Sequence, residues 1–179
     1  MTIYERLAEM NPYIERSDWD GLERGYLSIA ASLVGAPVLK RAEAVDFSQY
    51  EAGLRKPLGQ ALTRAGEPGV KAIYFEYDLD NNWKSAFYLC LSYFSEDQQD
   101  NDWAADWEQR IPGPDLPAAS TVYREHGFAK TDTAKGITLY LVARTVASFG
   151  RVVSQARRIG KPICIGFHDQ DPIMRMRES

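Results

Sequence analysis

The sequence predicts an α+β fold, with a helical N-terminal part over about residues 1–66 and an α+β part over about residues 67–179. Three observations carry this prediction: apolar residues recur at helical spacing in the first third, two β-rich runs flank a polar turn, and a long helical pattern precedes a final apolar run. We expect a small, mainly antiparallel sheet flanked by helices, made of a hairpin over about 70–94 and a strand over about 162–168. The length of 179 residues is typical of a single domain.

The first helical stripe covers 19–33, where apolar side chains recur three and four residues apart. Ser17 stands where an N-cap is expected. Gly35 and Pro37 should end this helix, because glycine and proline both interrupt helical structure.

A second helical stripe covers 47–62, and Asp46 is placed to open it. Pro57 lies inside this stripe, and its ring cannot continue the helical hydrogen bonds, so we expect a kink or a split there. The Gly- and Pro-rich turn at 66–69 then marks a change from helical to extended structure.

Two runs rich in β-branched and aromatic residues, 70–77 and 87–94, predict strands. The segment 78–84 between them is rich in Asp and Asn, which tolerate left-handed backbone and favour a hairpin loop. The two strands should therefore pair in antiparallel fashion.

The segment 95–117 is dense in Asp, Gly and Pro, and we expect it to hold only short helical pieces around 103–107. A long helix should follow over 133–158, with a strand at 137–142 as the competing interpretation. The apolar run 163–167 predicts a short buried strand that joins the hairpin.

The composition is that of an ordinary soluble globular protein: 45% of the residues are hydrophobic, 26% are charged and the net charge is −4. No apolar run of about 18 residues occurs and the first residues carry no signal-peptide core, so we expect neither a membrane span nor standard secretion. Cys90 and Cys164 each lie in an apolar run, which favours buried thiols in a reducing cytoplasm over a disulfide or a zinc site. We expect no cofactor.

Charge is unevenly distributed along the chain. Residues 76–110 carry nine acidic side chains against two basic ones, whereas residues 144–179 carry seven basic side chains against three acidic ones. The acidic stretch would repel a phosphate backbone, so we do not expect nucleic acid as the partner of this region.

The pattern Asp78-x-Asp80-x-Asn82 has the spacing that opens a calcium loop. Such a loop needs glycine at its sixth position and glutamate at its twelfth, and Trp83 and Leu89 stand there instead. A polar hairpin loop is therefore the better interpretation.

His168 and Asp169 follow the last predicted strand, and an imidazole at this place could act as a general base in a small enzyme. His126 could act in the same way. Cys164 lies four residues before His168, which is about 13 Å along a strand and too far for a nucleophile and its base. No G-x-S-x-G, Gly-rich phosphate loop, H-E-x-x-H or paired-acid motif is present, so we do not expect an enzyme.

Two tryptophans interrupt the acidic stretch 95–108. Tryptophan is frequent at binding hot spots, and carboxylates around it speed the encounter with a basic partner. In the alternative interpretation both tryptophans only pin a short helix to the core. The candidate partner-binding residues are Asp97, Asp100, Asp102, Trp103, Asp106, Trp107 and Glu108.

Three parts of the chain share their pattern with one known family: IYFEYDLDNNW at 73–83, DWAADW at 102–107 followed by GPDL at 113–116, and IGFHDQDP at 165–172. Together they resemble bacterial immunity proteins, the cytoplasmic antitoxins of polymorphic toxin systems, including those of contact-dependent growth inhibition. The resemblance covers about 70–176 and leaves the N-terminal helices without a recognised motif.

The resemblance implies a cytoplasmic, non-enzymatic inhibitor that binds the C-terminal toxin domain of its cognate partner and blocks its active site. Many such toxins are nucleases, whose basic clefts an acidic surface would occupy. Immunity proteins diversify at their contact surfaces, so the motif residues Trp83, Asp106 and His168 could instead hold the fold. A homo-oligomeric module that buries residues 103–107 against a second copy is a further alternative.

Overall fold

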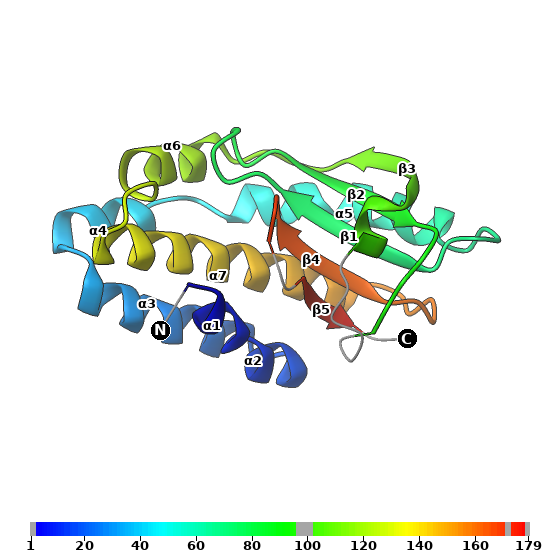
Figure 1. Ribbon diagram of the computed structural model, residues 1–179, viewed down its shortest axis with the longest axis horizontal. Coiled ribbons are helices and arrows are strands. Elements are labelled where there is room, and N and C mark those ends of the chain that lie inside the picture. Colours follow the sequence, from blue (N-terminus) through cyan, green and yellow to red (C-terminus); the bar gives the residue numbers. More distant parts are fainter. Residues whose placement is uncertain (1–2, 96–101, 171–172, 178–179) are drawn as a thin grey trace.

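A computed structural model describes residues 3–95, 102–170 and 173–177 of the chain (Figure 1). Within these residues one five-stranded sheet has the strand order β3-β2-β1-β4-β5. Its strands are β1 (Ala72–Tyr77), β2 (Ser85–Cys90), β3 (Trp107–Pro112), β4 (Ile163–Phe167) and β5 (Met174–Arg177). Every neighbouring pair is antiparallel except β1 and β4, which run parallel. The predicted α+β class with a mainly antiparallel sheet is confirmed.

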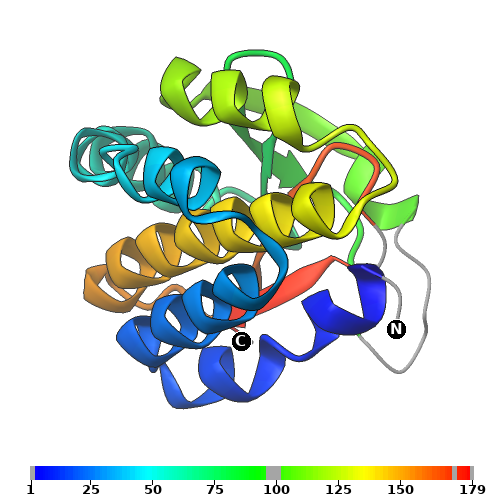
Figure 2. The same ribbon diagram turned by 90° about the vertical axis from the view of Figure 1, so that its left-hand side faces the viewer.

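The helices gather chiefly on one side of this sheet, where Figure 2 shows the long ones running side by side. Helices α5 and α7 cover the sheet, and α3 packs along α7. The elements are α1 (Ile3–Ala8), α2 (Asn11–Arg16), α3 (Trp19–Leu33), α4 (Ala36–Glu43), α5 (Ser48–Arg64), the short 3-10 helix η2 (Asp102–Ala105), α6 (Pro117–His126) and α7 (Asp132–Gln155).

The cap of α3 differs from the prediction by one residue. The Asp18 carboxylate, not the Ser17 hydroxyl, accepts the hydrogen bond of the Gly21 N–H, over 2.9 Å. Ser17 instead ends α2 in the left-handed conformation. The prediction failed because it did not include α2, whose end lies directly before α3. Pro37 also has a second role, since it lies in the first turn of α4, where a missing N–H costs no hydrogen bond.

Helices α5 and α7 confirm two predicted helices. Asp46 accepts the N–H of Ser48 at the start of α5, and the helix runs through Pro57 without a split. α7 begins after Thr131, whose hydroxyl accepts the N–H of Ala134, and the competing strand at 137–142 does not form. By length and composition α7 is apolar enough to cross a membrane, but 89% of its most apolar window is buried inside the structure, as in the core helix of a soluble protein.

The β1–β2 hairpin and strand β4 also form as predicted, with 78–84 as the hairpin loop. Strand β2 begins at Ser85 and ends at Cys90, earlier at both ends than expected. The expectation that 95–117 holds only short helical pieces is wrong: η2 is one, but β3 follows it. β3 is an edge strand with mostly exposed side chains, so it lacks the apolar alternation that marks a half-buried strand.

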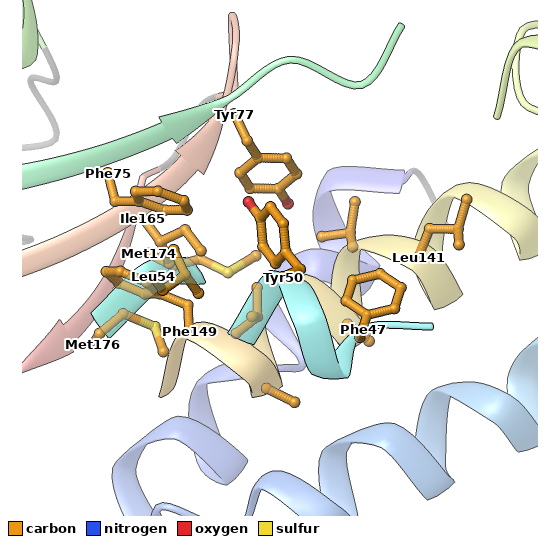
Figure 3. Packing of buried hydrophobic residues seen from close by; sticks show 14 of the residues in the cluster. Phe47, Tyr50, Leu54, Phe75, Tyr77, Leu141, Phe149, Ile165, Met174 and Met176 are labelled. Carbon is orange, nitrogen blue, oxygen red and sulfur yellow. The ribbon is translucent and has the colours of Figure 1, made fainter. Parts of the chain in front are cut away.

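The main core lies between the sheet and the helices. Phe75 of β1 stacks on Phe149 of α7, with ring centroids 4.5 Å apart and planes 10° from parallel. Figure 3 shows Phe75 near Leu54 of α5 and Ile165 of β4, so the sheet and the helices that cover it meet at this point. Aromatic contacts of this kind add to the free energy gained by burying apolar area.

A second, smaller cluster covers part of the opposite face of the sheet. There Trp103 of η2 packs on Tyr74 of β1, together with Ile173. Cys90 and Cys164 lie in the same cluster as buried thiols without a disulfide, as predicted. Of the helices that the structure describes, only η2 lies over this face: it lies in front of the sheet in Figure 1, while α5 lies behind it. Trp107, Arg110 and Pro112 of β3 are exposed on this face.

Candidate functional site

The predicted partner-binding residues separate into three groups in the structure. Asp97 and Asp100 lie outside the described residues. Trp103 is buried, whereas the other four candidates are exposed: Asp102, Asp106, Trp107 and Glu108.

The burial of Trp103 follows from its aromatic neighbours. Its ring lies edge-on to Tyr74 at 6.1 Å and to Tyr93 at 5.0 Å between centroids, and only 1% of the residue is exposed. Trp103 thus packs η2 onto the sheet. This agrees with the alternative interpretation, in which the tryptophan only holds a short helix to the core. Its indole offers no surface to a partner in this conformation.

Trp107 behaves differently, because the chain leaves η2 and enters β3 before reaching it. It is 43% exposed, and its ring packs on Tyr88 of β2, with centroids 5.0 Å apart. The Arg110 guanidinium lies over the same tyrosine at 5.9 Å, and its Nε donates to the Tyr88 hydroxyl at 3.3 Å. Trp107, Tyr88 and Arg110 therefore form a row of packed side chains on the sheet face opposite the long helices.

A bulge in the β2–β3 ladder lies directly beside the exposed Trp107. Trp107 pairs with Cys90 while Gln109 pairs with Leu89, so Glu108 is the additional residue on β3. Just beyond, the Leu91 N–H donates to the Asp106 carbonyl at 2.7 Å. This bond brings Leu91, which is 36% exposed, to the same end of the sheet as Trp107.

We name these side chains the acidic-aromatic surface: Tyr88, Leu91, Asp102, Asp106, Trp107, Glu108 and Arg110. It combines exposed apolar area, which costs free energy in water, with carboxylates that favour a basic partner. Tyr88, Leu91 and Arg110 are absent from the sequence prediction because it contained no strand at β3. Trp107 and Ile111, two residues with high β propensity, are a weak local signal for this strand.

A second candidate is a shallow pocket of about 300 Å³ at the carboxyl ends of the parallel strands β1 and β4. Because parallel strands end at the same edge, they bring the β1–β2 loop beside His168, and α1 and α6 each add a tyrosine. The lining residues are Tyr4, Asp78, Leu79, Asp80, Tyr123, Phe167, His168 and Asp169. A small enzyme that used His168 and Asp169 would need a pocket at this place.

The electrostatics around His168 are those of an exposed imidazole among carboxylates. Its Nδ1 lies 3.4 Å from the Glu76 carboxylate, and its Nε2 lies 3.8 Å from that of Asp169. Partial burial lowers the pKa of His168, but these two carboxylates outweigh it and raise the pKa above 6.5 overall. The Tyr74 hydroxyl donates to the other Glu76 oxygen at 3.3 Å, so Glu76 links the imidazole to the sheet.

The described lining of this pocket combines aromatic and acidic side chains with one leucine and one histidine. Among the residues that the structure describes, it contains no serine, threonine, cysteine or lysine, and Cys164 is buried in the second cluster. Nearby, a hydrogen bond that the protonated Asp80 carboxyl donates to Asp78 raises the pKa of Asp80, with burial and the negative charge of Asp78 acting in the same direction. The arrangement suits a weak acid–base group or a contact with a cationic side chain. His126, the other histidine, lies on α6 within 3.2 Å of Arg41.

The β1–β2 loop itself is tied to the protein through its backbone. The Asn82 N–H donates to the Ser120 hydroxyl, and the Leu116 N–H donates to the Asn82 carbonyl. Trp83, at the sixth position of the calcium-like spacing, is fully buried. These contacts describe a loop that positions α6 and the pocket wall.

Comparison with known proteins adds no relative: no family model matches the chain, and no curated protein or solved structure matches it.

Proposed function

We propose that this protein is a cytoplasmic immunity protein that binds a cognate toxin domain through the acidic-aromatic surface and neutralises it without catalysis. The observation that carries the proposal is the exposed Trp107, packed against Tyr88 and flanked by Asp106 and Glu108. The resemblance of 73–83, 102–116 and 165–172 to immunity proteins supplies the class of partner.

The charge of the surface fits an inhibitor of a basic cleft. Trp107 would bury its exposed face in the partner, while the carboxylates would occupy groups that bind substrate phosphates. An inhibitor of this kind needs no cofactor, and it blocks access to the toxin active site.

The test begins with a tagged full-length protein used to capture partners from the bacterium that encodes it. An enriched C-terminal toxin domain is then purified, and its affinity and the inhibition of its activity are measured. Tight binding of about nanomolar Kd, roughly −12 kcal/mol, together with loss of toxin activity, is the expected result. A toxin that is expressed but neither captured nor inhibited would overturn the proposal.

Two matched variants locate the interface. Asp106→Lys with Glu108→Lys reverses two charges on the acidic-aromatic surface, and Glu15→Lys with Glu43→Lys reverses two exposed charges on α2 and α4. The first pair should weaken toxin binding and its salt dependence, and the second should leave both close to wild type. Equal effects of the two pairs would exclude this surface as the interface.

The His168 pocket favours a small enzyme as the second candidate function. His168→Ala separates the two candidates, because the imidazole is exposed and its loss should leave toxin inhibition intact. If His168→Ala is the only variant that fails to inhibit the toxin, the functional site lies at the pocket instead. For the homo-oligomer alternative, sedimentation should show a dimer that Trp107→Ala disrupts.

A further inference from the structure

The outer edge of β3 carries backbone groups that point away from the sheet. The Gly113 N–H donates to the Ser85 carbonyl at 2.9 Å, which fixes the phase of the β2–β3 ladder. Alternate residues of an antiparallel strand bond to the same neighbour, so Gln109 and Ile111 bond to β2, whereas Arg110 and Pro112 face outward. Within the described residues β3 pairs with β2 only, so this outer side of the ladder is open.

A groove of about 640 Å³ runs beside this edge, between β3 and α5. Its walls include Lys56, Gly59, Thr63 and Arg64 of α5, and Gln109 and Arg110 of β3. Gly59 leaves the helix wall open, because a Cβ added there would meet no atom within 4 Å. The groove therefore has space next to unpaired main-chain groups.

The groove is positively charged. Lys56 and Arg64 lie on its helix wall, and among the described residues no carboxylate belongs to its lining. Arg110 contributes its backbone to the rim, because its guanidinium lies over Tyr88 on the other face of the sheet. Glu67 lies nearby and accepts from Arg64 at 3.0 Å and from Gln109 at 3.2 Å, which offsets one of the two positive charges. The remaining excess favours an acidic ligand.

We propose that the groove between β3 and α5 binds an extended acidic segment of a partner protein, which adds to β3 as a sixth strand. The N–H and C=O of Arg110 would pair with the added strand, and Pro112, which has no N–H, would end the pairing. Alternate side chains of the segment would lie over Gly59, with carboxylates toward Lys56 and Arg64. This inference goes beyond toxin neutralisation, since the groove excludes Trp107 and Glu108 and shares only Arg110 with the acidic-aromatic surface.

The probe is a capped synthetic peptide in which glutamate alternates with valine, and the control is the same peptide with lysine in place of glutamate. Each is titrated into isotope-labelled full-length protein while amide NMR signals are followed. The acidic peptide should shift the amide signals of Arg110 and of α5 around Gly59, and the lysine peptide should not. Binding of both peptides alike, or of neither, would overturn the proposal.

Two pairs of variants test the geometry. Gly59→Trp fills the groove and Gly59→Ala does not, so the first should weaken acidic-peptide binding at least about tenfold and the second should change it less than about twofold. Arg110→Pro removes the outward N–H without breaking a β2–β3 bond, so it should bind at least about threefold more weakly than Arg110→Ala. If the amide spectrum of Arg110→Pro shows that this variant is unfolded, the two Gly59 variants decide the question. Equal peptide affinities of Gly59→Trp and Gly59→Ala would then refute the groove as the binding site.

Discussion

The indole N–H of Trp83 donates a hydrogen bond to the hydroxyl of Thr145 over 3.0 Å, deep in the core. Thr145 in turn donates to the Leu141 carbonyl, one turn earlier in α7. The bond thus joins the β1–β2 loop to α7, and within this loop both Asn82 and Trp83 have positive φ angles. Trp83 is a motif residue of the immunity-like pattern, and its contacts support a role in holding the fold.

This pair predicts a measurable coupling. Trp83→Phe removes the donor, Thr145→Val removes the acceptor, and each single variant should lose about 1–3 kcal/mol of unfolding free energy. The double variant should lose less than the sum by about 1 kcal/mol, because the same bond is absent in both singles. Urea denaturation of the four proteins measures this, and strict additivity would contradict it.

The two tryptophans of the acidic stretch should differ sharply in stability. Trp103→Ala empties a buried site and should cost about 3–5 kcal/mol, whereas Trp107→Ala loses mainly its contact with Tyr88 and should cost about 1 kcal/mol or less. Chemical denaturation compares them directly. A destabilisation of similar size in both would mean that Trp107 is not a surface residue.

His168 should make stability depend on pH near neutrality. Because its pKa is raised in the folded protein, its contribution is fully present below pH 6.5, its unfolded-state value, and is lost as the pH rises through the folded-state pKa. The imidazole is 61% exposed, so the effect should stay below about 1 kcal/mol. NMR titration should place the His168 pKa above 6.5, and Glu76→Gln should lower it. A His168 pKa that Glu76→Gln leaves unchanged would contradict the assigned pairing.

Substitution by alanine should change the stability in opposite directions at two helical glycines, Gly150 and Gly59. At Gly150 of α7 a Cβ would lie 2.5 Å from the Trp19 ring of α3, so Gly150→Ala should cost about 1–3 kcal/mol. Gly59→Ala meets open space on α5 and should gain about 0.5–1 kcal/mol from helix propensity. Thermal unfolding measures the direction of both stability changes. A stabilising effect of Gly150→Ala would mean that α3 and α7 are less closely packed.

Local sequence patterns predicted the elements whose apolar residues repeat with a clear period. The stripes over 19–33 and 47–62, the run from Ile137 to Val153, and the hairpin strands bury one face or more against neighbours, and burial imposes that period. The sequence also indicated the buried thiols and placed the pocket residue His168 directly after β4.

The sequence by itself thus determined the α+β class, the helical N-terminal part, the hairpin with its loop at 78–84 and the strand at 163–167. Only the tertiary structure decided that Trp107–Pro112 forms an edge strand, that Trp103 is buried while Trp107 is exposed, and that Tyr88 and Arg110 pack beside Trp107. The physical reason is that periodicity reports which residues are buried, whereas strand pairing and the stacking of distant side chains depend on contacts between segments far apart in the chain.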